Sequence, residues 1–583
     1  MNIFRELKEI FTREKHPWDK YYPKDKRNVK IPEGSLYDYI YNCSKDKMDN
    51  IAINYFGNLM NYREFFRQVD LCARALTSQG IRSDDVVSIC MANTPEAVIS
   101  FYAVSKIGAI ANMIHPLSSE EEIKHSLNST KSVMMIAINV CYDNIQNVIN
   151  DTSVYKVIVV SPRDSMTGLT SLGYYLLSDR KINIPNNSEK FVKWKDFIEK
   201  GKHYVQDVYV EKDKSDPAVI LHSGGTTGVP KNIVLSNGNI NVVPDQAKIS
   251  LYDTDETDRM LCILPMFHCF GLVETIHFPL ASGEEMILIP KFDAKRFDKL
   301  LTKYNPTIIP GVPTLFEAMI KNKHMQNVDL SNVKYVVSGG DTLNEERSNE
   351  VNKFLRSHHC KHDIVQGYGL TETSGGCIFP TRGVECPGAS GIPLPGNLIK
   401  IVDINTREEV KPYEKGEILI SGPSVMMGYL DNEKETNEIL EMDSKGRVWV
   451  HTGDMGYVNE DGVMFFVQRI KRLIIVSGYN VFPSHIEEIL NKHEYILNSC
   501  VVGIPHPYKI QVPKAYIVLK DGINPSSKIK SEIKEYCEKN LAKYMIPKEF
   551  VFRKSLPKTM IGKVDYKKLE DEKEEEKEKE VEE

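Results

Sequence analysis

Residues suited to phosphate chemistry gather in one short loop between two apolar runs, AVILHSGGTTGVPKNIVLSNGN. The loop contains glycines, hydroxyl side chains and one lysine: Ser223, Gly224, Gly225, Thr226, Thr227, Gly228 and Lys231. Glycines allow backbone amides to approach an anion without obstruction, and the hydroxyls and the lysine add donors and positive charge. A plain surface loop would explain the glycines but not the whole combination. The segment therefore predicts a polyphosphate-binding loop.

This loop differs from that of the P-loop NTPases, which requires Gly-Lys-Ser/Thr in sequence and opens directly into a helix. Here Val229 and Pro230 separate Gly228 from Lys231. The residues that follow, 233–235, are Ile, Val and Leu, which favour a strand. The sequence therefore predicts a phosphate loop of another kind.

The loop resembles the phosphate loop of the adenylate-forming superfamily, which includes acyl-CoA synthetases, peptide-synthetase adenylation domains and beetle luciferases. Further segments match motifs of that superfamily in its order: LPMFHCFGL (264–272), VSGGDTL (337–343), QGYGLTET (366–373), GEILISGPSVMMGYL (416–430), HTGD (451–454), RIKRLIIVSGYNVFP (469–483) and LPKTMIGKVD (556–565). The resemblance spans residues 35–568, and such an ordered set is specific. The chain is most similar to bacterial long-chain fatty acid–CoA ligases.

The resemblance implies a reaction in two steps. A carboxylate attacks the α-phosphorus of ATP to give an acyl adenylate and pyrophosphate, and the thiol of CoA then attacks the adenylate. Because both reactants of the first step are anions, the site must supply positive charge and hold them in line. The implied cofactors are ATP and Mg2+, with CoA as co-substrate, and the implied catalytic residues are Lys563, His268, Thr371 and Glu372.

By resemblance, the QGYGLTET segment binds the nucleotide. Tyr368 would be the aromatic platform for adenine, with Gln366 and Gly367 lining it. Gly340 would pass beneath the base, and Thr371 would hold the α-phosphate.

Other implied residues contact the metal, the sugar and the acid. Glu372 would bind Mg2+, with Ser223 completing the protein ligands of this hard cation. Asp454 would accept hydrogen bonds from the ribose hydroxyls, and Arg469 would contact the same sugar. His268 matches the histidine near the acyl carboxylate; the alternative is a core histidine satisfied by its neighbours.

The C-terminal motifs imply a moving domain. Lys563 would reach the forming acyl–phosphate bond, where its ammonium can stabilise negative charge. The small domain would then rotate about Lys471 and present Gly478 and Tyr479 to CoA. Ile475 stands where many relatives have a lysine, and this departure leaves open which thiol is the acceptor.

The elements expected around these motifs are those of an α/β protein. The patterns predict a helix over 62–76, a strand over 86–90 and a helix that opens with Thr94 and Pro95, an N-cap followed by proline at the first helical position. Apolar runs predict buried parallel strands at 218–221, 286–289, 307–309, 335–337 and 364–365. After residue 397, short strands separated by turn residues predict a β-rich subdomain.

The predicted organisation has four parts: an N-terminal amphipathic extension (1–34), a large AMP-binding domain of two α/β subdomains plus the β-rich subdomain (35–470), a small mobile C-terminal α+β domain (471–569) and an acidic tail (570–583). The extension has apolar residues at helical spacing, which could lie on a membrane surface. Its other face carries mixed charge and no basic cluster, which favours docking on the protein's own body. The cluster His358, His359, Cys360 and His362 is interpreted as an exposed helix end, not a metal site.

Composition excludes several classes of protein. The chain has 583 residues and a net charge of −6, which the acidic tail accounts for. Because the rest is near neutral, we expect no nucleic-acid binding. No CxxC pair, signal peptide or membrane-spanning run is present. We therefore expect a cytoplasmic protein, with peripheral membrane contact and a homodimer left open.

The sequence thus predicts a fatty acyl-CoA synthetase whose small-molecule substrates are a fatty acid, ATP and CoA. One alternative is an acyl or aryl adenylase that loads a separate carrier protein, or an aryl-CoA ligase. A second is a non-catalytic protein that binds acyl-AMP or nucleotide on the same fold. The presence of Lys563 favours an enzyme over this second alternative.

Overall fold

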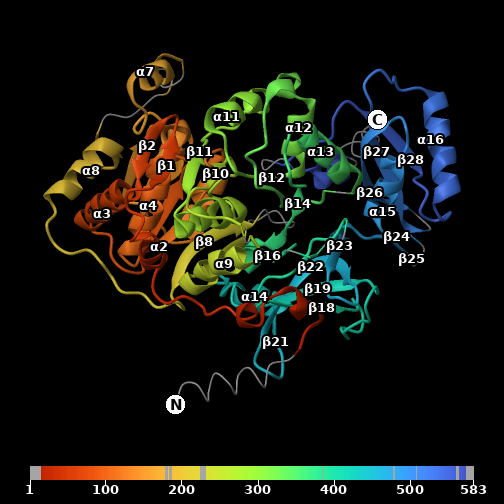
Figure 1. Cartoon of the computed structure of the whole chain (residues 1–583), viewed down its shortest axis with the longest axis horizontal. Helices are drawn as coiled ribbons and strands as arrows, with labels where there is room; N and C mark the ends of the chain where they lie inside the picture. Colours follow the sequence, from red (N-terminus) through yellow and green to blue (C-terminus); the bar gives the residue numbers. More distant parts are fainter. Residues whose placement is uncertain are drawn as a thin grey trace. The chain divides into compact units, whose positions relative to one another are not determined.

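The computed structural model describes residues 15–177, 182, 187–223, 231–251, 253–343, 345–381, 383–384, 387–476, 479–506, 509–559 and 563–572. The chain divides into two compact units (Figure 1). Unit 1 contains Met1–Lys400, Leu419–His451 and Asn459–Met464, and unit 2 contains Ile401–Ile418, Thr452–Val458 and Phe465–Glu583. The amphipathic stretch that was predicted at the N-terminus and most of the acidic tail lie outside the described residues.

Unit 1 contains a seven-stranded sheet in the order β14-β13-β12-β10-β11-β1-β2. Its strands are β14 (Val365–Gln366), β13 (Tyr335–Ser338), β12 (Ile308–Gly311), β10 (Arg259–Cys262), β11 (Glu285–Leu288), β1 (Ile51–Tyr55) and β2 (Asn58–Asn61). Neighbours from β14 to β1 pair in parallel, and β2 is antiparallel to β1. The carboxyl ends of β13 and β14 carry the VSGGDTL and QGYGLTET segments.

An eight-stranded sheet in unit 1 has the order β20-β9-β8-β4-β3-β5-β6-β7. Its strands are β20 (Gly428–Tyr429), β9 (Lys231–Ser236), β8 (Pro217–Ser223), β4 (Ile110–Met113), β3 (Val86–Cys90), β5 (Met134–Ile138), β6 (Lys156–Val160) and β7 (Phe191–Lys193). The sheet is parallel from β8 to β7, whereas β9 is antiparallel to both β8 and β20. Its buried strands and helices share one large apolar core.

Two smaller sheets follow along the chain. One consists of β15 (Tyr368–Leu370), β16 (Gly375–Phe379) and β17 (Ile392–Pro393). The other has the order β18-β19-β22-β21, with β23 paired to β22: β18 (Leu398–Val402), β19 (Gly416–Ser421), β22 (Val448–Val458), β21 (Leu440–Met442) and β23 (Met464–Arg469). The second sheet, whose strands begin at Leu398, confirms the predicted change to β-rich structure after residue 397.

Helices separate the strands as an α/β pattern requires. They are α2 (Leu36–Ser44), α3 (Tyr62–Ser78), α4 (Pro95–Lys106), α5 (Glu120–Ser129), α6 (Tyr142–Val148), α7 (Gly168–Leu177), α8 (Trp194–His203), α9 (Asn237–Ser250), α10 (Phe278–Ser282), α11 (Phe297–Tyr304), α12 (Pro313–Lys321), α13 (Glu345–Ser357) and α14 (Glu433–Ile439). Helix α4 begins where predicted, because Thr94 accepts a hydrogen bond from the backbone N–H of Ala97 at its N-terminus.

Unit 2 contains the sheet β25-β24-β27-β26, with β28 paired to β27. Its elements are β24 (Ile474–Val476), β25 (Tyr479–Val481), α15 (Pro483–Asn491), β26 (Ile496–His506), β27 (Ile510–Leu519), α16 (Ser527–Asn540) and β28 (Glu549–Arg553). The sheet is antiparallel except for the β27–β28 pair. Residues from its strands and helices form a separate apolar core, as expected for an independent α+β domain.

The interpretation of the histidine cluster as an exposed helix end is wrong for two of its residues. Helix α13 ends at Ser357, but His358 and Cys360 are buried. The His358 ring lies within hydrogen-bonding distance of the carbonyls of Phe354 (2.8 Å) and Met325 (3.1 Å), which draws it into the protein. Within the described part of the chain, no helix combines the length and the apolar character needed to cross a membrane.

Candidate functional site

The two ends of the predicted phosphate loop are paired strands. Ser223 ends β8 and Lys231 begins β9, and the two residues face each other in the antiparallel register. The loop residues between them, among them Gly224, Gly225, Thr226, Thr227 and Gly228, lie outside the described residues. The sheet therefore places Lys231 directly beside the end of the buried strand that leads into the loop.

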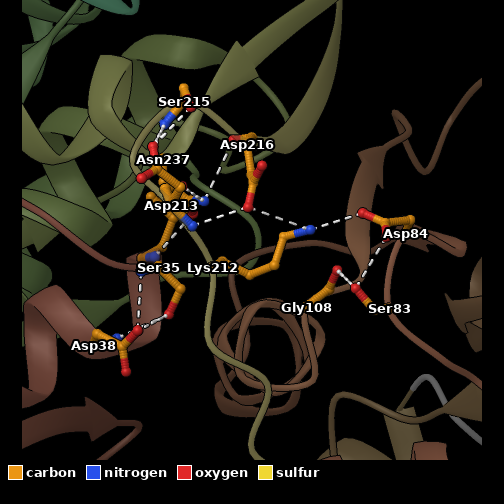
Figure 2. A network of polar contacts seen from close by, with 11 residues as sticks. Ser35, Asp38, Ser83, Asp84, Gly108, Lys212, Asp213, Ser215, Asp216 and Asn237 are labelled. Carbon is orange, nitrogen blue, oxygen red and sulfur yellow. Dashed lines mark hydrogen bonds and ion pairs between the residues drawn. The ribbon is translucent and has the colours of Figure 1, made fainter.

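A polar network holds the start of this buried strand (Figure 2). The Lys212 ammonium lies 2.7 Å from Asp84 Oδ1 and 3.5 Å from Asp216 Oδ2. The Asn237 side chain donates to the backbone carbonyls of Asp213 (3.0 Å) and Asp216 (3.3 Å). Because Asp216 immediately precedes β8, these contacts fix the entry of the strand that ends at Ser223.

Residues of the predicted adenine site lie at the ends of two parallel strands. Gly340, two residues after β13, has a φ of +79°, a conformation that favours glycine. Gln366 ends β14, and its Oε1 accepts the N–H of Leu343 (2.7 Å). Gly367 donates its N–H to the carbonyl of Ser338 (2.9 Å). The carboxyl ends of parallel strands are the usual place for ligands in α/β sheets, so this location suits a nucleotide.

The strand after Gly367 leads to a short turn that contains Thr371 and Glu372. Tyr368 begins β15, and the turn η9 (Thr371–Thr373) follows that strand. The Glu372 carbonyl accepts the N–H of Met426 (2.9 Å), and the Thr371 carbonyl accepts the N–H of Ser374 (3.1 Å). Thr371 and Glu372 are half-buried. The turn is therefore fixed at its backbone while both side chains keep some access to solvent.

Glu372 and Lys231, distant in sequence, meet at one tyrosine. Tyr429 donates its hydroxyl to Glu372 Oε1 (3.1 Å), and the Lys231 ammonium lies 4.6 Å from the centroid of the Tyr429 ring. Lys231 also pairs with Glu435 Oε2 at 2.7 Å. The hydrogen bond from Lys231 lowers the pKa of Glu435, whereas burial and the nearby Glu372 carboxylate raise the pKa of Tyr429. The cluster therefore brings a cation to the ring and a carboxylate to the hydroxyl of one tyrosine.

Sequence reasoning did not single out Tyr429 and Glu435. Tyr429 lies in the GEILISGPSVMMGYL segment, a motif in which no single residue was assigned a role. Glu435 follows in helix α14. No local spacing links either residue to Glu372 or Lys231. The pairing of β20 with β9 brings Tyr429 opposite Ile233, and this pairing is a tertiary contact.

His268 lies just before a π-helix, η6 (Phe270–His277). Its ring is half-buried and 4.9 Å from the ring of Phe267, which lies 4.3 Å from the ring of His115. Phe270 closely approaches Gly339, where an added Cβ would lie 2.8 Å from Phe270 Cε1. The LPMFHCFGL segment is therefore packed beside the glycine turn that follows β13.

In unit 2, Asp454 and Arg469 form an ion pair. Asp454 Oδ1 lies 3.0 Å from Arg469 Nε. The Asp454 side chain is 2% exposed, whereas that of Arg469 is 46% exposed. Asp454 lies in β22 and Arg469 ends β23, so the sheet brings together the two residues predicted to bind ribose.

The remaining predicted residues of unit 2 lie on separate elements. Lys471 is exposed in the turn η10 (Ile470–Arg472), and Tyr479 begins β25. Lys563 is half-buried; its N–H donates to Thr559 Oγ1 (3.2 Å), and its carbonyl accepts the N–H of Thr559 (2.7 Å). Gly478 lies outside the described residues. These two contacts tie the backbone of Lys563 to Thr559.

Family models match both units. A model described as AMP-binding enzyme matches residues 41–430, and one described as AMP-binding enzyme C-terminal domain matches residues 485–563. The chain belongs to the AMP-binding enzyme family. The predicted superfamily and the α/β fold class, with a large N-terminal and a small C-terminal domain, are confirmed.

Relatives cover nearly the whole chain. It is 30% identical to a long-chain-fatty-acid–CoA ligase of Bacillus subtilis (strain 168), with 95% of this chain and 98% of the relative aligned. It is 32% identical to a probable 4-coumarate–CoA ligase of Dictyostelium discoideum, over 93% of this chain and 96% of the relative. The fold is similar to that of ATP-bound MatB from Rhodopseudomonas palustris (TM-score 0.79, 22% identity, 92% of this chain and 98% of that one). These similarities support adenylate-forming acid–CoA ligase chemistry, although the relatives are named for different acids.

Proposed function

We propose that this protein activates a fatty acid with ATP, releasing pyrophosphate, and transfers the acyl group from acyl-AMP to CoA. The observation that carries the proposal is the convergence of Lys231, Glu372 and Tyr429, which come from three distant segments of unit 1. Such a cluster offers a cation to phosphate oxygens and a carboxylate to a metal ion. The Bacillus subtilis relative supports a fatty acid as the substrate.

In the first step, residues of unit 1 hold the nucleotide. Lys231 and the loop after Ser223 would bind the phosphates, Thr371 would contact the α-phosphate, and Tyr368 would stack on adenine, with Gly340 beneath the base. His268 would lie near the carboxylate of the acid. Each of these groups acts by positioning two anions that repel each other and by stabilising the charge that develops at phosphorus.

Glu372, together with Ser223, would hold Mg2+. The carboxylate fits this role, since among the described residues it accepts a hydrogen bond from the Tyr429 hydroxyl and pairs with no lysine or arginine. Bound there, the cation would neutralise charge on phosphate oxygens.

Residues of unit 2 would complete the reaction. Asp454 would accept hydrogen bonds from the ribose, Arg469 would contact the same sugar, and Lys563 would stabilise the negative charge of the first transition state. We place the domain boundary at 470/471, so that rotation about Lys471 would withdraw Lys563 and bring Gly478 and Tyr479 to CoA for the second step.

An aryl-CoA ligase is the second candidate, since the Dictyostelium discoideum relative is named for an aryl acid. A pyrophosphate-release assay across straight-chain and aryl carboxylic acids, with and without CoA, separates the candidates. Release with fatty acids, accompanied by thioester, supports the proposal. If no acid in the panel supports pyrophosphate release, an enzyme of this class is refuted. Release without thioester formation indicates a carrier-protein acceptor.

A further inference from the structure

Glu274 is a carboxyl group that contacts the chain directly after the turn containing Thr371 and Glu372, and the proposed reaction assigns it no role. It lies in the π-helix η6, six residues after His268. π-Helical turns are rare and occur frequently at functional sites. The residue is half-buried as a whole, while its Oε2 atom is out of contact with solvent.

One oxygen of this carboxyl is fixed by the backbone that follows Thr371 and Glu372. Glu274 Oε1 accepts the N–H of Gly376 at 2.5 Å. At Gly375, which has a φ of +96°, an added Cβ would lie 2.1 Å from Oε1 and 2.9 Å from Oε2. The carboxyl therefore lies against the chain directly after the turn η9, and a side chain at residue 375 would displace it.

The other oxygen has no hydrogen-bond partner among the residues that the structure describes. Burial raises the pKa of Glu274 to about 8, so the group carries its proton at neutral pH. Because Oε1 accepts the Gly376 N–H, Oε2 is the oxygen available to carry the proton of the neutral carboxyl and to act as an O–H donor. A protonated carboxyl in an apolar site is a strong donor for a ligand oxygen.

We propose that Glu274 determines acyl specificity by donating a hydrogen bond from Oε2 to an oxygen of the acyl group, so that the preferred acid carries a hydroxyl or carbonyl group beyond its carboxylate. This inference rests on the proposed acid–CoA ligase function. Its geometric basis is that Glu274 lies on the helix that continues from the His268 segment and contacts Gly375 and Gly376, directly after the turn that carries Thr371 and Glu372. A plain alkyl chain would leave the donor unpaired, and sites built to bond a polar group discriminate strongly against analogues that lack it.

The test compares matched acids: straight-chain fatty acids of eight to sixteen carbons, and the same chains with a hydroxyl or oxo group at one of several positions. For the wild-type protein, we expect kcat/KM for pyrophosphate release to be at least about tenfold higher for one substituted acid than for its parent. Glu274→Gln keeps a donor and an acceptor and should retain this preference. Glu274→Leu should reduce the ratio of kcat/KM between the substituted acid and its parent to about threefold or less.

Glu96→Gln is a matched control. Glu96 is buried, burial raises its pKa to about 7, and its Oε2 also has no hydrogen-bond partner within the described ranges. Glu96 lies in α4, where Ser165 donates to its Oε1 (2.5 Å). Glu96→Gln should leave the preference for the substituted acid unchanged. Glu274→Met replaces the leucine variant if thermal unfolding shows that the latter does not fold.

Two results would overturn the inference: equal kcat/KM for every matched pair in the wild type, or a preference that survives in the apolar variant. Either result leaves the proposed function intact, because pyrophosphate is still released. Absence of release with every acid in the wild type would instead refute the proposed function.

Discussion

The two units hold their candidate residues in different ways. In unit 1, Glu372 and Lys231 are fixed by contacts with Tyr429 and Glu435, and the turn that carries Glu372 is held by backbone hydrogen bonds. In unit 2, Asp454 is deeply buried, whereas its partner Arg469 and the nearby Lys471 are exposed. Unit 1 therefore gathers a half-buried carboxylate and a lysine around one tyrosine, whereas these two cationic side chains of unit 2 lie at its surface.

The largest effect is expected for Lys563→Ala. Loss of the ammonium should slow adenylate formation by about a thousandfold, because nothing else in unit 2 is proposed to stabilise the charge at phosphorus. Thioester formation from prepared acyl-AMP should change by less than about threefold, since that step is proposed not to use Lys563. Pyrophosphate release and thioester formation, measured separately, distinguish the steps. The exposed Lys554→Ala is the control, and an equal loss of both steps would contradict alternation between them.

Two adjacent residues of unit 2 should differ sharply in their effect on stability. Arg472 is largely buried; it pairs with Glu487 and donates to the carbonyl of Val501 (3.3 Å). Arg472→Leu leaves the carboxylate buried without its cation and should lower the free energy of unfolding of unit 2 by about 3–5 kcal/mol. Lys471 is exposed, so Lys471→Leu should change the free energy of unfolding of unit 2 by about 0.5 kcal/mol or less. Hydrogen exchange of β26 amides measures both, and similar values would show that the arginine does not anchor the unit.

In unit 1, removing a carboxylate should cost more than removing the hydroxyl that orients it. Glu372→Gln should reduce pyrophosphate release about a hundredfold and raise the Mg2+ concentration needed for half-maximal rate. Tyr429→Phe removes one hydrogen bond to a charged group and should reduce the rate about tenfold. Magnesium titrations of both variants test the order. A larger effect of the tyrosine variant would mean that Tyr429 does more than position Glu372.

The smallest effect is expected for Glu435→Gln. Its ion pair with Lys231 is partly exposed and is therefore worth about 1 kcal/mol or less. Without the carboxylate, Lys231 would be released toward phosphate, and the KM for ATP should fall about threefold. Glu433→Gln, at an exposed position two residues earlier in α14, should leave the KM for ATP unchanged. A higher KM for ATP in the Glu435 variant would show that the pair positions Lys231 for binding.

Local patterns predicted much of the fold. Thr94 and Pro95 determine the start of α4 because capping and a fixed φ act within a few residues. Apolar runs predicted β3, β8 and β13 to within two residues at either end, since a strand buried on both faces needs continuous apolar sequence. The pattern failed at His358, whose burial depends on a contact between its ring and the backbone carbonyl of Met325, an acceptor from another segment.

The sequence by itself determined the family and the class of fold and predicted which segments carry the chemistry, because ordered motifs and local periodicity can be read along the chain. Only the tertiary structure decided which side chains meet. Tyr429 reaches Glu372 through the pairing of β20 with β9, and Glu274 reaches Gly376 across 102 positions of sequence. Such contacts depend on sheet order and helix packing, which no local spacing encodes. That Glu274 Oε2 has no hydrogen-bond partner among the described residues is likewise a property of the fold, since a glutamate in sequence does not reveal its burial or the rise in pKa that burial causes.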